Sequence, residues 1–510
     1  MTPPRSDPPG EPGGRLGFAD YRPDETWQAD VCIVGAGAGG AAAALALAER
    51  GLDVVVVEEG SHWYPQQFQQ DAAWAYRHIY AEQGARSAVG NAVIPVPGGR
   101  GVGGSTLINS AICFRTPEPV MRQWANEHGC HRLGPDRFPA FLDRVWETLR
   151  VVVNPVVFQR NNNLIFKSGA DRLGLAGHWM PRSAPACVGC GVCYLGCPVG
   201  GKASVDRTFL VEARQTGRCR VHGDCRVAEI TTEGDRVVAV AGALVDPADL
   251  KPKGRFEVRA RAFLLSAGPV GTPKLLLANG LADPERCGAW LYLHPATGML
   301  ARFQQEIRPW HGVTQGYYVD HWQEGYLLQT YTASPDQTYA GMPYSLGDSL
   351  LAAIADLRHM AMAGPLVHDE DSRGGVSLAG MTYFLGHGDR RRLLAGMRQC
   401  ARVFLAAGAV EVYAGIVGAR PIRDEGDVDA VISLDAPARR IYLYASHPMG
   451  SCRMGADPEH STIDPDGRVW GWRNLYVADA SVFPTSLGVN PQVTTMAVGL
   501  VVGEQVAAST

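Results

Sequence analysis

The chain has 510 residues, a formal net charge of −4 and a hydrophobic content of 46%. A chain of this length is expected to divide into two or three subdomains, because a single core stops growing well below it. The small negative charge argues against a general nucleic-acid-binding protein, and no run approaches the roughly 18 apolar residues that a membrane span needs.

Residues 1–27 are predicted to be a disordered leader. The opening letters, MTPPRSDPPGEPGGRLG, are rich in proline and glycine and contain no apolar core of a signal peptide. Twelve cysteines in so long a chain also do not indicate a secreted, disulfide-rich scaffold. We therefore expect a cytoplasmic protein.

The stretch from Val31 to Gly60 has the arrangement of a dinucleotide-binding unit. An apolar run ending at Val34 predicts a buried strand, and an alanine-rich helix is predicted up to about Arg50. A second apolar strand ends just before Glu58. The turn between the first strand and the helix carries the spacing G-x-G-x-x-G, formed by Gly35, Gly37 and Gly40. This is the dinucleotide fingerprint in its strand–turn–helix–strand setting.

The chemistry of this unit follows from its residue types. Glycines let the backbone approach a pyrophosphate, and the start of the helix turns free N–H groups and positive dipole toward it. The carboxylate of Glu58 is placed to accept hydrogen bonds from the ribose hydroxyls of an adenosine. The unit therefore predicts a bound dinucleotide.

A second glycine-rich segment, PGGRGVGGSTLINSAICFRTP, runs from Pro97 to Pro117. So many glycines favour an extended backbone lying against something large and flat, followed by a helix that begins near Ser105 or Thr106. Taken with the first unit, the segment resembles the glucose–methanol–choline (GMC) oxidoreductase family of flavoproteins. The family signature G-R-x-x-G-G-S-S/T-x-x-N is matched from Gly99 to Asn109.

The resemblance implies that this segment cradles the pyrophosphate and the edge of a flavin. The residues that it assigns to FAD here are Gly103, Gly104, Ser105 and Asn109. Some family members carry a histidine in this segment that bonds covalently to the flavin. Because no histidine lies between Gly98 and Arg115, we expect the FAD to be non-covalent.

The sequence CVGCGVCYLGCPVGGK, residues 187–202, forms a cysteine box. Its spacing, C-x2-C-x2-C-x3-C-P, matches the bacterial ferredoxin run, so an iron–sulfur cluster is one prediction. The tentative ligands are Cys187, Cys190, Cys193 and Cys197. The competing interpretations are a structural zinc site and free thiols in a turn-rich loop.

The role of the fourth cysteine is open, because the chain has no second box. Cys197 either closes a local four-cysteine site, stays unligated beside a three-iron cluster, or gives way to a remote thiol such as Cys219 or Cys225. Many GMC-like sequences carry related cysteine loops. The bacterial FAD glucose dehydrogenases, which hold a cluster at a similar place, resemble this chain there, although their cysteine spacing is not identical.

The middle of the chain is interpreted by its resemblance to the GMC family. The strand-like run from Cys225 to Ile230 resembles the family strand whose backbone, here near Val227, contacts adenine. The run Ala260–Gly280 predicts a buried strand, a turn and a helix that complete the flavin domain's sheet. The aromatic region from about His294 to Asp435 is expected to form a mixed sheet that covers the flavin.

The C-terminal motif HPMGSCRMG places His447 after a strand-like run and resembles the family pattern H-x-x-G-T/S-C-x-M-G. Asp479 ends a predicted strand and is placed to hold a ribityl hydroxyl. Asn490 is a predicted helix N-cap, with Pro491 at the first helical position. A helix that begins there would turn its positive end toward the flavin pyrimidine.

Alcohol oxidation needs a base for the hydroxyl proton while hydride leaves carbon for flavin N5. Histidine suits this step because its unperturbed pKa lies near neutrality. Asn490 offers both a donor and an acceptor to the alcohol oxygen. The resemblance therefore implies that His447 and Asn490 are the catalytic residues.

The predicted fold is α/β, with a discontinuous Rossmann-like FAD-binding domain and an α+β substrate domain containing a mixed or antiparallel sheet. The predicted division assigns 28–123, 205–290 and 440–510 to the FAD-binding domain, and 124–204 and 291–439 to the substrate domain. The predicted reaction is FAD-dependent oxidation of an alcohol to an aldehyde or ketone.

The resemblance points most closely to bacterial oxidisers of sugar alcohols, including those acting on the 6′-hydroxyl of aminoglycosides in antibiotic biosynthesis. The expected partners are thus a small sugar or amino-sugar alcohol and an electron acceptor that is oxygen or a redox partner. The alternatives are a dehydrogenase for another sugar or aliphatic alcohol, which passes electrons through an iron–sulfur cluster to a protein or quinone, and a non-redox flavoprotein lyase of the same fold.

Overall fold

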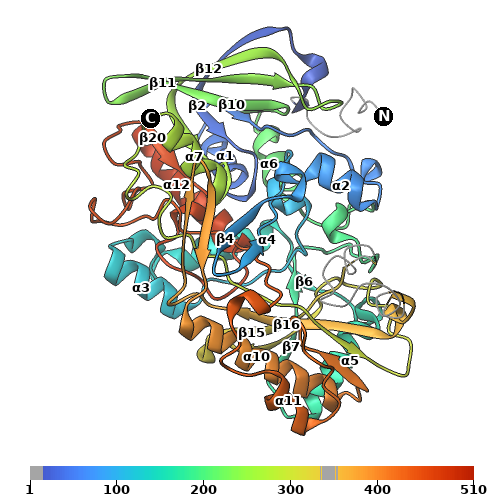
Figure 1. Ribbon diagram of the computed structural model, residues 1–510. Helices are drawn as coiled ribbons and strands as arrows, with labels where there is room; N and C mark the ends of the chain where they lie inside the picture. The colour runs from blue at the N-terminus through green and yellow to red at the C-terminus, as the bar shows by residue number, and fades with distance from the viewer. Residues whose placement is uncertain (1–14, 334, 336–350, 352–353) are drawn as a thin grey trace.

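The computed structural model describes residues 15–333, 335, 351 and 354–510. Two sheets dominate it, an eight-stranded sheet near both chain ends and a six-stranded sheet at the opposite end of the molecule (Figure 1). Each sheet has its own hydrophobic core. This α/β arrangement confirms the predicted fold class.

The predicted dinucleotide unit is present as strand, helix and strand. These are β2 (Asp24–Val34), α1 (Ala38–Glu49) and β3 (Val54–Val57), and β2 and β3 pair in parallel. Helix α1 is followed by Gly51, which has a φ of +82° that glycine adopts without strain.

Small residues in α1 let it pack closely against α12 (Gln492–Ser509). A Cβ added at Gly499 would come within 2.3 Å of the Gly39 carbonyl oxygen, so the helices meet backbone to backbone. The alanine and glycine content of α1 is thereby explained by packing, and α12 is held at the same edge of the sheet as the glycine turn.

The parallel part of the large sheet gathers strands from distant parts of the chain. Strand β12 (Pro252–Leu265) pairs with β2 on one edge and with β20 (Leu475–Val477). On the other side β3 pairs with β9 (Cys219–His222), and β9 with β1 (Arg15–Leu16). Because all of these pairs are parallel, their carboxyl ends share one edge, where ligands of such sheets bind.

An antiparallel meander extends this sheet. Strands β10 (Cys225–Glu233) and β11 (Arg236–Val245) pair with each other, and β11 pairs with β12. Helix α7 (Gly268–Ala278) follows β12 directly, as the sequence predicts. The meander lies at the top of Figure 1.

The six-stranded sheet is antiparallel in every pairing between neighbours. Its order is β19 (Glu411–Tyr413), β13 (Met299–Arg302), β16 (Met360–Val367), β15 (Tyr326–Thr330), β14 (Tyr317–His321) and β7 (Gly177–Trp179). Helices α10 (His387–Ala406) and α5 (Val156–Arg172) pack on it (Figure 1).

Smaller elements complete the described fold. A four-stranded sheet has the order β17 (Arg373–Ser377), β18 (Gly380–Phe384), β4 (Ser87–Gly90) and β5 (Val93–Pro95), and β6 (Val152–Val153) pairs with β8 (Pro181–Arg182). The remaining α-helices are α2 (Ala72–Ile79), α3 (Glu118–His128), α4 (Phe138–Thr148), α6 (Phe209–Gln215) and α11 (Glu425–Val431).

The structure departs from the predicted division in three places. The part of the predicted disordered leader at 15–27 is ordered and includes β1 and the start of β2, whereas its part at 1–14 lies outside the described residues. Helix α4 packs against α12 in the first core, although the boundary at 123 assigns it to the substrate domain. Strand β4, which the predicted division assigns to the FAD-binding domain, pairs with β18 in the region assigned to the substrate domain.

Over the described parts of the chain, none of the helices combines the length and the apolar character that crossing a bilayer would require.

Candidate active site

The structure brings His447 and Asn490 together, although 43 residues separate them in the sequence. Nε2 of His447 lies 3.1 Å from Nδ2 of Asn490. The segment around His447 runs beside residues 291–297, with Ala296 bridged to Tyr444 before His447 and Tyr292 bridged to Met449 after it. Asn490 stands two residues before the first residue of α12.

A second histidine, His294, completes the group, and the sequence analysis does not identify it. Its Nδ1 lies 3.3 Å from Nδ1 of His447, and its side chain is fully buried. Its backbone has a φ of +53°, a left-handed conformation that is strained for a residue other than glycine. The one signal in the sequence is that both histidines precede a proline, Pro295 and Pro448.

Buried acceptors hold His294 in this conformation. The carboxylate of Asp369 accepts the backbone N–H groups of Leu293 (2.9 Å) and His294 (2.8 Å). Asp369 also accepts the hydroxyl of Tyr383, at 2.5 Å. The position of the His294 ring is therefore determined by the surrounding protein.

Both imidazoles are neutral near pH 7. Burial lowers the pKa of His447 to about 3, with the charge of His294 acting in the same direction and that of Asp369 opposing it. Burial likewise lowers the pKa of His294 well below its ordinary value, and the charge of His368 adds to the effect. A neutral imidazole can accept a proton, so the group has the charge state that a base requires.

A hydrogen bond at Gly488 determines where the protons lie. The Gly488 N–H donates to Nε2 of His294 over 2.9 Å, so a neutral His294 carries its proton on Nδ1. That proton is donated to Nδ1 of His447. A neutral His447 then carries its own proton on Nε2, which requires the Asn490 amide to turn its oxygen toward His447 and the Gln329 amide to turn with it.

Asn490 is held by a second carboxamide. Nε2 of Gln329, on β15, donates to Oδ1 of Asn490 over 2.9 Å. The prediction that Asn490 caps α12 is wrong by one residue, because α12 begins at Gln492 and Pro491 is its N-cap residue without a side-chain cap. The side chain of Asn490 is directed to His447 and Gln329 instead of the helix N-terminus.

The two predicted FAD segments lie against each other. The Gly103 N–H donates to the Ala36 carbonyl over 3.0 Å. A Cβ at Gly104 would stand 2.7 Å from the Cα of Gly37, and one at Gly40 would stand 2.0 Å from the Gly35 carbonyl oxygen. The fingerprint turn and the second glycine segment thus form one backbone-lined cradle, which suits a pyrophosphate.

Glu58 links the two glycine segments of this cradle through hydrogen bonds to its carboxylate. Its carboxylate accepts the N–H groups of Ala36 (3.0 Å), Gly60 (3.1 Å) and Gly101 (3.1 Å). Burial raises the pKa of Glu58 to about 7, with the charge of Glu59 adding to the rise and these N–H groups opposing it. The structure therefore gives Glu58 a role in joining the two segments, and its contact with a ribose stays a prediction.

The other predicted FAD residues lie at this edge. Asp479 is buried at the end of β20 and accepts the N–H of Gly268, 2.9 Å away, at the start of α7. Asn109 donates to Gln492, the first residue of α12, over 2.9 Å. Ser105 accepts the N–H of Gly99 at 2.9 Å, within the second glycine segment. Val227 lies on β10, two residues after Cys225, whose N–H bonds to the Glu58 carbonyl.

The cysteine box folds as a compact loop. Cys193 is buried, and the remaining members, Cys187, Cys190 and Cys197, are half-buried. The suggested remote thiols lie elsewhere, because Cys219 and Cys225 are buried on strands β9 and β10 of the large sheet. Within the described part of the chain, no three or more His, Cys, Asp or Glu side chains are arranged to hold a metal ion.

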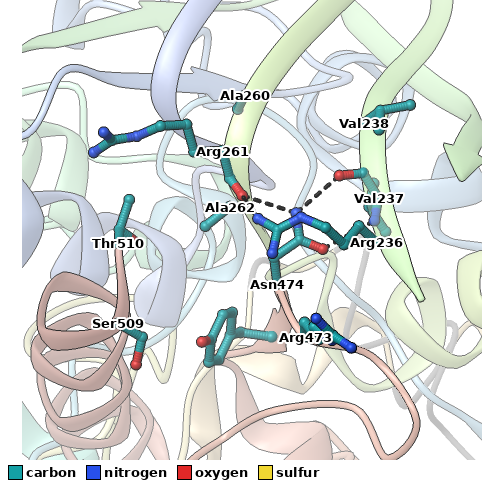
Figure 2. A pocket seen from close by; sticks show the side chains of 11 residues that line it. Arg236, Val237, Val238, Ala260, Arg261, Ala262, Arg473, Asn474, Ser509 and Thr510 are labelled. Carbon is teal, nitrogen blue, oxygen red and sulfur yellow. Dashed lines mark hydrogen bonds between the residues drawn. The ribbon is translucent and has the colours of Figure 1, made fainter. Parts of the chain in front are cut away.

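A separate cavity of about 270 Å³ lies at the start of β20 and the end of α12 (Figure 2). The carboxamide of Asn474 stands at its wall and donates to the carbonyls of Val237 and Arg261, both at 2.8 Å (Figure 2). These bonds join the residue before β20 to β11 and β12. Because ligands of parallel sheets bind at the carboxyl ends, this cavity is not the active site.

Comparison with known proteins gives a consistent family assignment for the matched regions. Profiles described as GMC oxidoreductase match residues 76–296 and 367–499, and a profile described as FAD binding domain matches residues 30–74. A GMC-type oxidoreductase of Mycobacterium tuberculosis is 35% identical over 487 residues, covering 94% of this chain and 76% of that protein. A long-chain-alcohol oxidase of Arabidopsis thaliana is 29% identical and covers 92% of this chain and 66% of that protein.

Solved structures share the fold. Pyridoxine 4-oxidase from Mesorbium loti has a TM-score of 0.73 and 17% identity, covering 93% of this chain and 98% of that one. A formate oxidase variant from Aspergillus oryzae has a TM-score of 0.69 and 14% identity, covering 95% and 99%. At these identities the likeness concerns the fold alone.

Proposed function

The chain belongs to the GMC oxidoreductase family and is an FAD-dependent alcohol oxidoreductase, and we propose that it oxidises a primary alcohol to an aldehyde with His447 as the base. The observation that carries this proposal is the contact between His447 and Asn490, 3.1 Å apart beside the start of α12. The aldehyde product and the base are parts of the proposal.

The residues present suit FAD. The cradle of Gly35, Gly37, Gly40, Gly103 and Gly104 offers backbone at a distance that side chains would prevent. When bound there, FAD supplies a hydride acceptor at its N5 atom. The segment from Gly98 to Arg115 contains no histidine for a covalent bond, which supports the proposal that the cofactor is held without one.

His447 and Asn490 have different roles toward the alcohol substrate. The carboxamide of Asn490, held by Gln329, orients the hydroxyl oxygen. His447 receives the hydroxyl proton on Nε2 as hydride leaves the carbon. In the hydrogen-bond chain that starts at Gly488, however, Nε2 already carries a proton, so base action requires the tautomer with the proton on Nδ1. His294, which faces Nδ1, is therefore a positioning residue of the proposal.

The substrate class is the finer part of the proposal. The sequence resemblance favours a sugar or an aminoglycoside, as in antibiotic biosynthesis. The Arabidopsis relative is named for long-chain alcohols and aligns with nearly the whole of this chain, which supports an aliphatic alcohol more directly. We propose an aliphatic primary alcohol as the first substrate to test, with the amino sugar as the rival.

The electron acceptor is oxygen or a redox partner. The proposed oxidase returns the flavin to its oxidised form with oxygen, which becomes hydrogen peroxide, whereas a dehydrogenase needs a partner protein or quinone. A non-redox lyase of the same fold remains the second alternative. It predicts that no alcohol reduces the flavin.

The test is a panel of alcohols offered to the FAD-loaded protein with and without oxygen. The panel contains long-chain primary alcohols, sugars and aminoglycosides, and the readouts are aldehyde and peroxide. The proposal expects aldehyde from at least one primary alcohol. Aldehyde from aminoglycosides alone would replace the aliphatic class, and absence of aldehyde under every acceptor tried would contradict the proposed reaction.

A further inference from the structure

A row of side chains leads away from Asn490 across the six-stranded sheet. Gln329 on β15 bonds to Asn490. Directly opposite Gln329 in the sheet is Tyr318 on β14, and directly opposite Tyr318 is His178 on β7. Residues opposite each other in an antiparallel pair share one face of the sheet, with Cβ atoms about 5 Å apart. The face that holds Gln329 against Asn490 therefore also carries Tyr318 and His178.

This face is not the one that packs into the sheet's own core. Tyr317 and Val319, on either side of Tyr318, belong to the core of the six-stranded sheet. In β15, Leu328 belongs to that core as well, whereas Leu327 belongs to the core of the eight-stranded sheet. Because successive side chains of a strand point to opposite faces, the row is directed toward the FAD-binding part of the molecule.

Across the strands, the row continues from Gln329 in one direction only. On the other side of Gln329, its partner in β16 is Gly364. A Cβ at Gly364 would lie 1.9 Å from the carbonyl oxygen of Thr297, so the backbone of residues 291–297 covers the sheet there. In the opposite direction, β7 is the last strand of the sheet. The row therefore runs from the catalytic pair to the edge of the sheet at β7.

An aromatic side chain from the second glycine-rich segment joins this row. The ring of Phe114 lies 5.0 Å from the ring of Tyr318, edge to face. The ring of His178 lies 5.4 Å from that of Tyr318 on the sheet. Phe114 also packs against the core of the eight-stranded sheet. Three distant parts of the chain thus bring three aromatic rings together, one strand away from Gln329.

Exposure increases along the row from the catalytic pair to the edge of the sheet. Gln329 and Asn490 are 4% and 7% exposed. Tyr318 and Phe114 are half-buried, and His178 is exposed. The aromatic rings therefore lie between the buried carboxamides and solvent.

The chemistry of the row favours an uncharged ligand. Its polar groups at the inner end are carboxamides, because Gln315 bonds to Gln329 over 3.4 Å. The charged neighbours Asp320 and Arg115 are exposed, and Arg115 pairs with Asp143. Aromatic walls with a few polar groups at one end are typical of sites that bind apolar ligands in one orientation. An amino sugar would bring several charges that lose water here.

We propose that Phe114, Tyr318 and His178 bind the apolar tail of a primary alcohol whose hydroxyl group lies at His447 and Asn490. This inference rests on the proposed function, because that function places the reacting end of the substrate at the pair. Covering one methylene group with apolar surface strengthens binding about fourfold. Since the tail takes no part in the reaction, its contribution lowers KM and leaves kcat unchanged.

The test is the dependence of kcat/KM on chain length, from propanol to dodecanol, in the FAD-loaded protein. For the parent, the proposal expects a rise of up to about fourfold per carbon, expressed in KM. Tyr318→Ala and Phe114→Ala should lower kcat/KM about tenfold more for dodecanol than for propanol, which equals the contribution of roughly two methylene groups. The matched control is Phe384→Ala on β18, an aromatic residue that is 57% exposed and should keep the full dependence.

A milder variant keeps this test decisive if the first two lose their FAD. His178→Ala changes an exposed residue and should reduce the gain for the longest alcohols alone. Retained FAD absorbance shows which variants are folded. An unchanged dependence on chain length in every variant that retains FAD would overturn the proposal.

Binding of alkyl methyl ethers separates this inference from the proposed function. These ethers have no hydroxyl proton for His447 to remove, so calorimetry on them reports binding alone. The proposal expects their affinity to rise with chain length in the parent and to rise less in Tyr318→Ala. If this holds while no alcohol reduces the flavin, the proposed reaction is wrong and the apolar site stands. Binding of aminoglycosides but not of ethers, lost in Tyr318→Ala, would overturn the apolar tail.

Discussion

The histidine pair and the cysteine box are both polar clusters that contain buried ionisable groups, but burial affects the charge of these groups in opposite ways. At the pair, burial keeps His294 and His447 neutral. At the box, buried Arg182 donates to Sγ of Cys193 and buried Lys202 donates to the Cys193 carbonyl. A neutral imidazole is suited to moving a proton, whereas fixed cations are suited to holding an anion. The difference separates a neutral pair suited to proton transfer from a loop that buried basic side chains hold in place.

The two clusters also differ in how the chain assembles them. The four cysteines fall within residues 187–197 and one loop brings them together. The histidine group needs three distant segments, since His294 lies 153 residues before His447 and Asn490 lies 43 after it. Substitutions at the pair should therefore act on the reaction, whereas those at the box should act mainly on the local structure of the loop.

The largest effect is expected at His447. His447→Ala removes the base, so the rate of flavin reduction by alcohol should fall about 10²- to 10⁴-fold while FAD stays bound. Stopped-flow absorbance under nitrogen measures this rate. The control is His460→Ala, an exposed histidine that should leave the rate unchanged. A variant that reduces its flavin as fast as the parent would remove His447 from the mechanism.

A smaller effect is expected at His294. His294→Phe takes away the group that faces Nδ1 of His447, so flavin reduction should slow by about 10- to 100-fold, the usual cost of a misplaced catalytic group. The pH profile of the rate should change as well, because the charge of His294 lowers the pKa of His447. A faster reaction would show instead that the proton from His294 restrains the base.

Substitution of Gly104 tests the glycine cradle. Gly104→Ala places a Cβ 2.7 Å from the Cα of Gly37, at a φ of +52°, so FAD should bind about tenfold or more weakly, about 1.4 kcal/mol. Gly51→Ala is the matched control, because Gly51 also has a positive φ but no atom within 4 Å of the added Cβ. Equal FAD affinity in the two variants would argue that the contact of the glycine segments does not form the cofactor site.

The local parts of the fold could be predicted from the sequence, because strand, glycine turn and helix in the first unit follow from neighbouring residues. The His447 motif could be recognised in the same way. His294 could not, since its place depends on Asp369 and Gly488, far away in the chain. The prediction that Asn490 caps a helix was wrong for the same reason, because its side chain bonds to Gln329 on β15, a distant part of the chain.

The smallest expected effect concerns stability in acid. His222 is buried outside both clusters, stacks on Trp27 with ring centroids 3.9 Å apart, and has a pKa that burial, with Arg220, lowers to about 3. Its unfolded pKa is about 6.5, so the unfolded chain binds the extra proton first, and stability falls as the pH drops from about 6.5 to 3.

His222→Phe should remove this part of the acid sensitivity, at most about 3 kcal/mol between pH 7 and pH 4 at roughly 1.36 kcal/mol per pH unit. Urea unfolding at pH 7 and at pH 4 measures it, and alcohol oxidation should be unaffected. An identical loss of stability in the variant and the parent would show that His222 does not titrate on unfolding.

The most direct test of the central claim is anaerobic mixing of the FAD-loaded protein with primary alcohols while the flavin absorbance is followed. The account predicts that at least one primary alcohol bleaches the flavin, that aldehyde forms in equal amount, and that His447→Ala nearly abolishes the bleaching. A flavin that stays oxidised with every alcohol, in protein that holds a full complement of FAD, would contradict it.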